Sequence, residues 1–163
     1  MAENVTPPVQ GEEESVRQGA TSERLREKLG GCIRTGEITL SSGKVTDFYF
    51  DGRLVSLDPE GSVLIAELML DALEARGISA VGGLTSGADP LTSSIGVLAW
   101  QKGVEMNLFF VRKERKEHGM QQRVEGPPFP DREGLKVALV DDVLTTGGSL
   151  LQAREALVEE LGV

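Results

Sequence analysis

Residues 137–150, with the sequence VALVDDVLTTGGSL, decide how this chain folds. Four apolar residues predict a buried strand, Asp141 and Asp142 end it, and hydroxyl residues and glycines turn the chain into a helix over residues 149–161. In parallel α/β sheets, ligands bind at the carboxyl ends of the strands. The stretch therefore predicts a strand–turn–helix unit and a binding site at its turn.

The turn at residues 145–149 suits a phosphate group, because it offers hydroxyl donors, unobstructed backbone N–H groups and the positive end of a helix. It lacks the lysine of a nucleotide-hydrolysing P-loop. The two aspartates would repel a phosphate, but they accept hydrogen bonds from sugar hydroxyls and suit a nearby Mg²⁺. An Asp-Asp pair alone is more often a solvated strand end with a helix cap, whereas the whole run predicts a phosphorylated-sugar site.

The rest of the chain alternates strands and helices. Asp58-Pro59 supplies an N-cap and a first-turn proline for a helix that ends at Gly77. Further elements are expected as strands at residues 78–84, 104–111 and 136–140 and as helices at 88–102 and 149–161. Parallel neighbours need crossover connections, so this order predicts an α/β fold with helices on both faces of a parallel sheet.

The N-terminal third and one internal stretch complete the predicted organisation. Residues 1–20 are polar and acidic, which predicts a disordered tail, and a short helix is expected from Ser22, with Leu25, Leu29 and Ile33 on one face and a stop at Gly30 or Gly31. Residues 36–57 predict a strand pair. Residues 112–134 predict a long, structureless functional loop.

Composition excludes several classes of protein. The 163 residues suit one domain, and 26 acidic against 17 basic residues argue against nucleic-acid binding. No apolar run is long enough to span a bilayer, and residues 1–10 do not have the pattern of a signal peptide, so we expect a cytoplasmic protein without a membrane partner. Cys32 and His118, each the only one of its kind, exclude a closed zinc site and leave a hard, oxygen-bound metal.

A basic segment lies in this otherwise acidic chain. Residues 112–123 hold five basic and two acidic side chains, a concentration that can attract a polyanion. A charged run of this kind is by itself more often a solvated face. Its position between two predicted strands, followed by a glycine and a long loop, favours the functional interpretation.

Four motifs in order carry a resemblance to a known family. Residues 137–150 resemble the phosphoribosyl-pyrophosphate signature of type I phosphoribosyltransferases. Residues 109–119, FFVRKERKEHG, resemble the catalytic loop of the orotate phosphoribosyltransferases, and so do residues 36–61 and GGLTSGADPL at 82–91. The similarity runs from Ser22 to the last residue.

The resemblance implies a type I phosphoribosyltransferase-like domain over residues 21–163, with a small N-terminal hood at about 21–57. It implies transfer of the phosphoribosyl group from phosphoribosyl pyrophosphate to orotate with Mg²⁺, giving orotidine monophosphate and pyrophosphate. It also implies a homodimer in which residues 112–118 close over the neighbouring subunit's site. The Mg²⁺ is expected to be held mainly by substrate, near the two aspartates, with no side-chain ligand assigned.

The implied site residues divide by the part of the substrates that they meet. Asp141 and Asp142 hold the ribose hydroxyls, while the 5′-phosphate lies against Thr145, Thr146, Gly147, Gly148 and Ser149. The pyrophosphate meets Thr85, Ser86 and Gly87 together with Lys113, Lys116 and His118. The last three are the catalytic candidates, with Lys116 the strongest, and Arg112 is a further substrate-binding residue. Tyr49 and Phe50 lie near orotate. Phe50 is equally well interpreted as a core-packing residue. A lone histidine in a loop, such as His118, is most often an ordinary exposed side chain.

The sequence departs from the fullest family pattern in three places. Ser41 and Ser86 stand where some members carry a lysine. The chain ends after the helix at 149–161, whereas the family continues with a strand bearing an arginine for the orotate carboxylate. We therefore expect a truncated form that binds phosphoribosyl pyrophosphate better than it turns over orotate.

Two other functions remain open at this point. A regulator with the same fold would bind the sugar phosphate as an effector, and it would be expected to lack the loop bases and to gain a basic nucleic-acid domain. A purine-base phosphoribosyltransferase would share residues 137–150 but not residues 112–119 in this form.

Overall fold

The computed structural model describes residues 10–39, 43, 45–115, 122–129 and 134–162. Its main sheet has the strand order β5-β4-β3-β6. The strands are β3 (Ala80–Leu84), β4 (Asn107–Val111), β5 (Val124–Glu125) and β6 (Val137–Leu139). β3 pairs in parallel with β4 and with β6, and β5 joins the outer edge of β4 antiparallel. The predicted parallel sheet is confirmed, with an antiparallel edge strand added.

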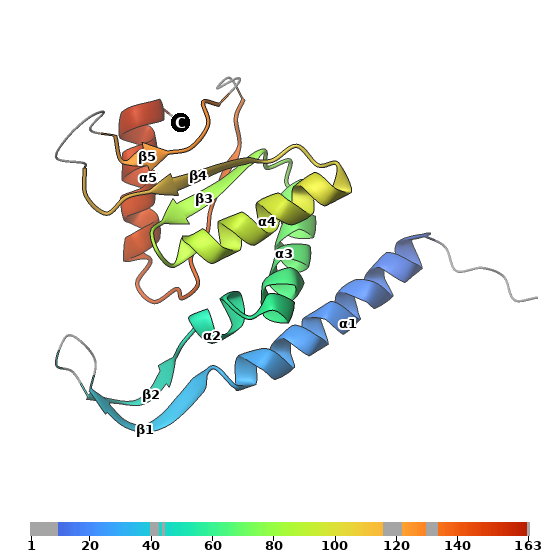
Figure 1. Ribbon diagram of the computed structural model, residues 1–163, viewed down its shortest axis with the longest axis vertical. Coiled ribbons are helices and arrows are strands. Elements are labelled where there is room, and N and C mark those ends of the chain that lie inside the picture. The colour runs from blue at the N-terminus through green and yellow to red at the C-terminus, as the bar shows by residue number, and fades with distance from the viewer. Residues whose placement is uncertain (1–9, 40–42, 44, 116–121, 130–133, 163) are drawn as a thin grey trace, which may run out of the picture.

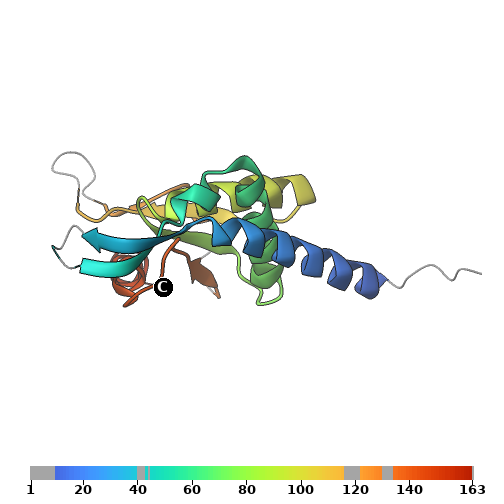
Figure 2. The ribbon, with the colours of Figure 1, turned by 90° about the horizontal axis from the view of Figure 1, so that it is seen from below.

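Helices cover both faces of this sheet, as the alternation of strands and helices predicts. α3 (Pro59–Glu74) and α4 (Ala88–Lys102) lie on one face and α5 (Gly148–Leu161) on the other (Figures 1 and 2). Successive residues of β3 point to opposite faces. Val81 packs with the α3 and α4 side chains, whereas Ala80 and Leu84 pack with those of α5. The parallel strands therefore run buried between two apolar layers, and their carboxyl ends share one edge.

The start of α3 follows the predicted capping pattern. The Asp58 side chain accepts a hydrogen bond from Gly61 N at 2.8 Å, and Pro59 occupies the first turn. A short helix that the sequence pattern did not predict, α2 (Arg53–Ser56), precedes this cap. A Cβ at Gly61 would lie only 2.3 Å from the Val55 carbonyl oxygen, so glycine is needed there for α2 to pack against α3.

The first helix is longer than predicted. α1 spans Gln10–Gly30, so the expected disordered tail is wrong for residues 10–20, and residues 1–9 lie outside the described part. Contacts with α3 explain the difference: Gln18 donates to Asp71 at 3.0 Å and Thr21 to Glu67 at 3.2 Å. These partners are about 50 residues away in sequence, which is why local composition did not reveal them.

An antiparallel hairpin follows α1, formed by β1 (Ile33–Thr39) and β2 (Val45–Phe50). The predicted strand pair is confirmed. Ile33, expected on the apolar face of the first helix, instead begins β1 and pairs with Phe50. In Figure 1, α1 and this hairpin extend along one side of the α/β body, with α2 between β2 and α3.

The expected structureless loop is partly ordered. Within residues 112–134, the two residues of β5 pair with Phe110 and Val111 of β4. Glu160 of α5 accepts hydrogen bonds from Arg123 N at 2.8 Å and Val124 N at 3.0 Å, which holds β5 in place. None of the described helices is long and apolar enough to cross a membrane. The predicted bounds of the hood and of the phosphoribosyltransferase domain stay predictions.

Candidate functional site

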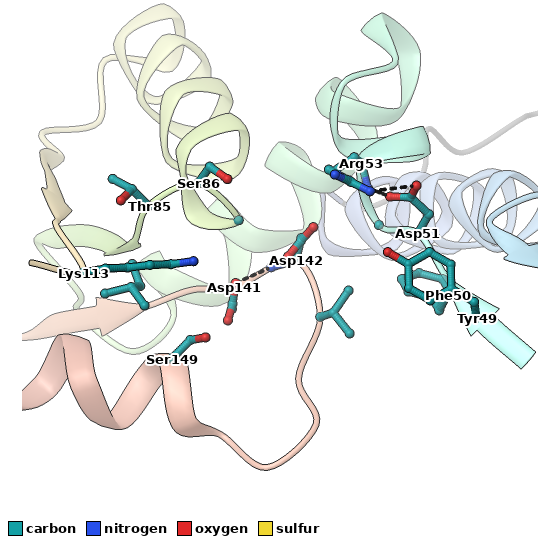
Figure 3. A pocket seen from close by; sticks show the side chains of 14 residues that line it. Tyr49, Phe50, Asp51, Arg53, Thr85, Ser86, Lys113, Asp141, Asp142 and Ser149 are labelled. Atoms are coloured by element: carbon teal, nitrogen blue, oxygen red, sulfur yellow. Dashed lines mark hydrogen bonds and ion pairs between the residues drawn. The ribbon is translucent and has the colours of Figure 1, made fainter. Parts of the chain in front are cut away.

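A cavity of about 350 Å³ opens at the carboxyl ends of β3 and β6. Four separate parts of the chain line it (Figure 3): residues 49–53 at the end of β2, residues 84–87 after β3, residues 141–143 after β6 with Ser149 of α5, and Lys113 after β4. The sheet topology brings these parts together although they are up to 100 residues apart. The predicted crevice at the strand ends is therefore present.

A second cavity, of about 370 Å³, adjoins the first around the turn between β6 and α5. The turn residues 143–149 line it, and Leu84, Lys113, Asp141, Val143 and Ser149 border both cavities. Gly147 has a φ of +78° at the N-cap of α5, and no side chain caps this helix. The backbone N–H groups of its first turn are therefore available to an anion, as the sequence predicts for a phosphate.

Two carboxylates lie at these cavities: Asp141 borders both of them, and Asp142 lines the first. Asp142 N donates to Asp141 Oδ1 at 3.1 Å. Burial raises the pKa of the Asp142 carboxyl, and the nearby Asp141 charge raises it further. Backbone hydrogen bonds from Asp142 and Val143, and to a smaller extent the Arg53 guanidinium, partly counteract this rise. Asp141 and Asp142 thus form a partly desolvated acceptor pair. Neutral donors such as sugar hydroxyls, or a divalent cation, are the chemical partners that such a pair favours.

The loop after β3 touches both carboxylates through a glycine. A Cβ at Gly87 would lie 2.4 Å from Asp141 Oδ1 and 2.6 Å from Asp142 Oδ1, closer than real Cβ contacts allow. Thr85 and Ser86 line the first cavity beside it. The three residues predicted to meet a pyrophosphate are therefore adjacent to the predicted sugar site, and the absence of a side chain at Gly87 lets the two loops meet.

The basic segment is placed only in part. Lys113 lines both cavities, as predicted for a phosphate-binding residue. Arg112 instead donates to Glu125 of β5 at 2.6 Å and does not line either cavity, and Arg115 is paired with Glu159 of α5. Lys116 and His118, the other catalytic candidates, lie outside the described residues. Their roles stay predictions.

The predicted aromatic pair is at the cavity, and one charged pair beside it was missed. Tyr49 and Phe50 line the wall formed by the end of β2. Asp51 and Arg53, which follow at once, line it too, and the Arg53 guanidinium grips the Asp51 carboxylate through Nε at 2.8 Å and Nη2 at 3.1 Å (Figure 3). The signal available in the sequence was an Asp-Gly-Arg triplet directly after an aromatic strand.

A metal site built wholly from side chains is not found in the described part of the chain. No group of three or more His, Cys, Asp or Glu side chains there is arranged to hold an ion. The Asp141–Asp142 pair still fits a Mg²⁺ bound chiefly by substrate oxygens, because Mg²⁺ commonly takes only one or two carboxylates and completes its shell with phosphates and water.

Comparison with known proteins agrees with the geometry. The phosphoribosyl transferase domain family matches residues 60–163, which include both cavity-lining loops of the sheet. An orotate phosphoribosyltransferase of Rhodopseudomonas palustris is 44% identical over 144 residues, a stretch that covers 85% of this chain and 77% of the relative. The chain belongs to the orotate phosphoribosyltransferase family.

Other members of this family show the same relationship. The orotate phosphoribosyltransferase of Rhodopirellula baltica is 49% identical over 132 residues, covering 77% of this chain and 67% of the relative. The crystal structure of Mycobacterium tuberculosis orotate phosphoribosyltransferase in complex with 5-phospho-alpha-D-ribosyl 1-diphosphate matches with a TM-score of 0.62 and 32% identity, covering 87% of this chain and 74% of that one. The predicted family and fold are thereby confirmed.

Proposed function

We propose that this chain transfers the phosphoribosyl group from 5-phosphoribosyl 1-pyrophosphate to orotate, giving orotidine 5′-monophosphate and pyrophosphate. The observation that carries the proposal is the pair of adjoining cavities in which a carboxylate pair lies between an uncapped helix N-terminus and the loop after β3. Family membership and the M. tuberculosis relative's complex with the sugar pyrophosphate support it.

The two ends of the sugar would meet different parts of this site. The 5′-phosphate would lie in the turn at residues 145–149, where backbone N–H groups and the dipole of α5 stabilise an anion. The ribose hydroxyls would donate to the Asp141 and Asp142 carboxylates. This arrangement would hold the anomeric carbon beside the loop at residues 85–87, where the pyrophosphate would leave.

The reaction needs charge stabilisation more than covalent help. Breaking the anomeric C–O bond leaves its electron pair on pyrophosphate and positive charge on the ribose ring. A ring nitrogen of orotate then forms the new bond to that carbon, and its N–H proton passes to pyrophosphate or to water. Lys113 would stabilise the leaving pyrophosphate, with Lys116 and His118 as further donors. A bound Mg²⁺ would supply additional neutralisation of the pyrophosphate. Tyr49 and Phe50 would form the wall beside the orotate ring.

Two features of the predicted assembly belong to the same proposal. We place the protein in the cytoplasm as a homodimer in which the 112–118 segment, with Lys116 and His118, reaches the neighbouring subunit's site, while Lys113 lines the cavities of its own chain. Sedimentation of the chain measures the dimer directly. Mixing a Lys116→Ala chain with an Asp142→Ala chain tests the sharing, because mixed dimers would regain one complete site and activity only if Lys116 acts across subunits.

Pyrophosphate release with orotate, adenine, hypoxanthine and uracil in parallel tests the reaction, and calorimetry measures binding of phosphoribosyl pyrophosphate separately. The proposal predicts binding, Mg²⁺-dependent release with orotate, and little release with the other bases. Binding without release under any condition would contradict phosphoribosyl transfer by this chain and would fit a catalytically impaired fragment or an effector-binding role. Release with a purine base in preference to orotate would contradict the choice of acceptor.

A further inference from the structure

The Asp142 carboxylate is confined between two glycines from different parts of the chain. On one side, the Cβ that Gly87 lacks would lie 2.6 Å from Asp142 Oδ1. On the other side, a Cβ at Gly52 would lie 3.2 Å from Asp142 Oδ2 and equally close to the Asp142 Cβ and carbonyl oxygen. Asp142 Oδ1 therefore faces the backbone at Gly87, and Oδ2 faces the backbone at Gly52.

The backbone at Gly52 is itself held firmly. Asp51 N donates to Cys32 O at 2.9 Å, which ties this point to the start of the hairpin, and Ser56 N donates to Gly52 O at 2.9 Å inside α2. Two hydrogen bonds from the Arg53 guanidinium to the Asp51 carboxylate stabilise the same turn. Gly52 is buried, so a substitution there meets Asp142 before it can reach solvent.

The contact joins two parts of the molecule that are far apart in sequence. Gly52 lies directly after β2 of the N-terminal hairpin, and Asp142 lies directly after β6 of the main sheet. The cavity wall from residues 49–53 and the carboxylate pair thus meet at this close approach. A displacement of the β2–α2 turn would be transmitted to the orientation of the carboxylate.

We propose that Gly52 is a positioning residue for Asp142, so that the end of the hairpin sets the geometry with which the carboxylate receives the ribose hydroxyls. This inference rests on the proposed function, because it takes the sugar to bind at Asp142. Gly52 itself need not touch substrate. It acts by fixing the position of an acceptor oxygen, and a misplaced acceptor loses much of a charge-assisted hydrogen bond.

The experiment compares Gly52→Ala with Gly30→Ala, a matched control whose added Cβ meets no atom within 4 Å. Calorimetry measures affinity for two probes, ribose 5-phosphate and inorganic phosphate. Gly52→Ala should weaken ribose 5-phosphate binding by roughly ten- to a hundredfold, the range for losing a hydrogen bond to a charged group. Inorganic phosphate should bind as before, since the turn at residues 145–148 does not touch Gly52, and Gly30→Ala should change neither affinity.

A double-mutant cycle separates positioning from general damage. In an Asp142→Ala background no carboxylate remains to be displaced, so Gly52→Ala should have little further effect on ribose 5-phosphate affinity. Equal losses for both probes, or an undiminished effect in that background, would overturn the inference. If Gly52→Ala does not fold, Arg53→Gln loosens the same turn and should show the same selective loss.

Binding by the native chain separates the positioning role of Gly52 from the proposed function. Native binding of ribose 5-phosphate with unchanged affinity in Gly52→Ala would overturn the positioning role and leave the proposed function intact. Failure of the native chain to bind either ribose 5-phosphate or phosphoribosyl pyrophosphate would overturn both.

Discussion

Lys28 Nζ lies 2.6 Å from Asp58 Oδ2, and the same carboxylate oxygen accepts a hydrogen bond from Gly61 N at 2.8 Å. The last turn of α1 is therefore joined to the N-cap of α3. Because α2 lies directly before this cap and begins at the cavity wall, the junction fixes the base of the wall on which Tyr49 and Phe50 lie.

Replacing Asp58 tests how much this junction contributes to thermal stability. Asp58→Ala removes both the cap and the ion pair and should lower the Tm by about 3 °C, whereas Asp58→Asn keeps a capping side chain and should lower it less. Thermal unfolding followed by circular dichroism makes the comparison. Equal Tm values for the native chain and Asp58→Ala would show that the observed cap contributes nothing measurable.

Stability should fall at acidic pH because of the same cluster. Hydrogen bonds from Arg24 and then Lys28 lower the pKa of Glu60 from 4.5 to about 2. A carboxyl with a depressed pKa in the folded state stabilises fully above its unfolded pKa and loses that contribution as pH falls toward the folded value. The Tm should therefore decline between pH 4.5 and about 2, and Glu60→Gln should show a shallower decline. Parallel slopes for the two proteins would contradict this assignment.

Lys113 borders both cavities, and among the described residues of the 112–123 segment it is the basic residue that does so. Lys113→Ala should lower kcat/KM for phosphoribosyl pyrophosphate at least about tenfold and leave the Tm nearly unchanged, because an exposed lysine contributes to charge stabilisation and little to packing. Lys136→Ala is a suitable control, since Lys136 lies before β6, outside both cavity linings. Equal effects of the two substitutions would remove Lys113 from the proposed mechanism.

Arg112 provides a contrast with its neighbour. Since its Nε donates to Glu125 at 2.6 Å, Arg112→Gln should weaken phosphoribosyl pyrophosphate binding less than Lys113→Gln does. Calorimetric affinities of the two variants decide the order. A larger loss for Arg112→Gln would mean that this side chain leaves Glu125 when substrate binds, as the family resemblance implies.

Gly87 should tolerate no side chain. An alanine there would place its Cβ 2.4 Å from Asp141 Oδ1, so one of the two loops must shift. Gly87→Ala should therefore abolish measurable sugar-phosphate binding, while Gly19→Ala, with no atom within 4 Å of the added Cβ, should bind normally. Normal binding by Gly87→Ala would show that the two loops need not meet in this way.

Local sequence patterns predicted the strand–turn–helix unit and the caps well, because the signals are carried by neighbouring residues. Asp58 and Pro59 begin α3, and the glycines at 147 and 148 lead into α5 as expected. The extent of α1 could not be predicted in this way, because its N-terminal half depends on Asp71 and Glu67 of α3. The pairing of β5 with β4 depends likewise on Glu160, which lies 36 residues further along the chain.

In the site, too, local motifs could be predicted from the sequence and tertiary contacts could not. Asp141, Asp142 and the turn after them are contiguous, so their motif is visible in the sequence. The contribution of Gly52, Asp51 and Arg53 arises only when the end of β2 packs against the end of β6, and no local pattern encodes that approach. The pairing of Arg112 with Glu125 is another tertiary contact that the charge count of the segment could not reveal.

A crystal structure of the chain with phosphoribosyl pyrophosphate and Mg²⁺ would show where the sugar phosphate binds. We expect the 5′-phosphate in the turn at residues 145–149, the ribose hydroxyls on Asp141 and Asp142, and the pyrophosphate against residues 85–87. A sugar phosphate bound elsewhere, or a turn left empty at saturating ligand, would contradict this expectation.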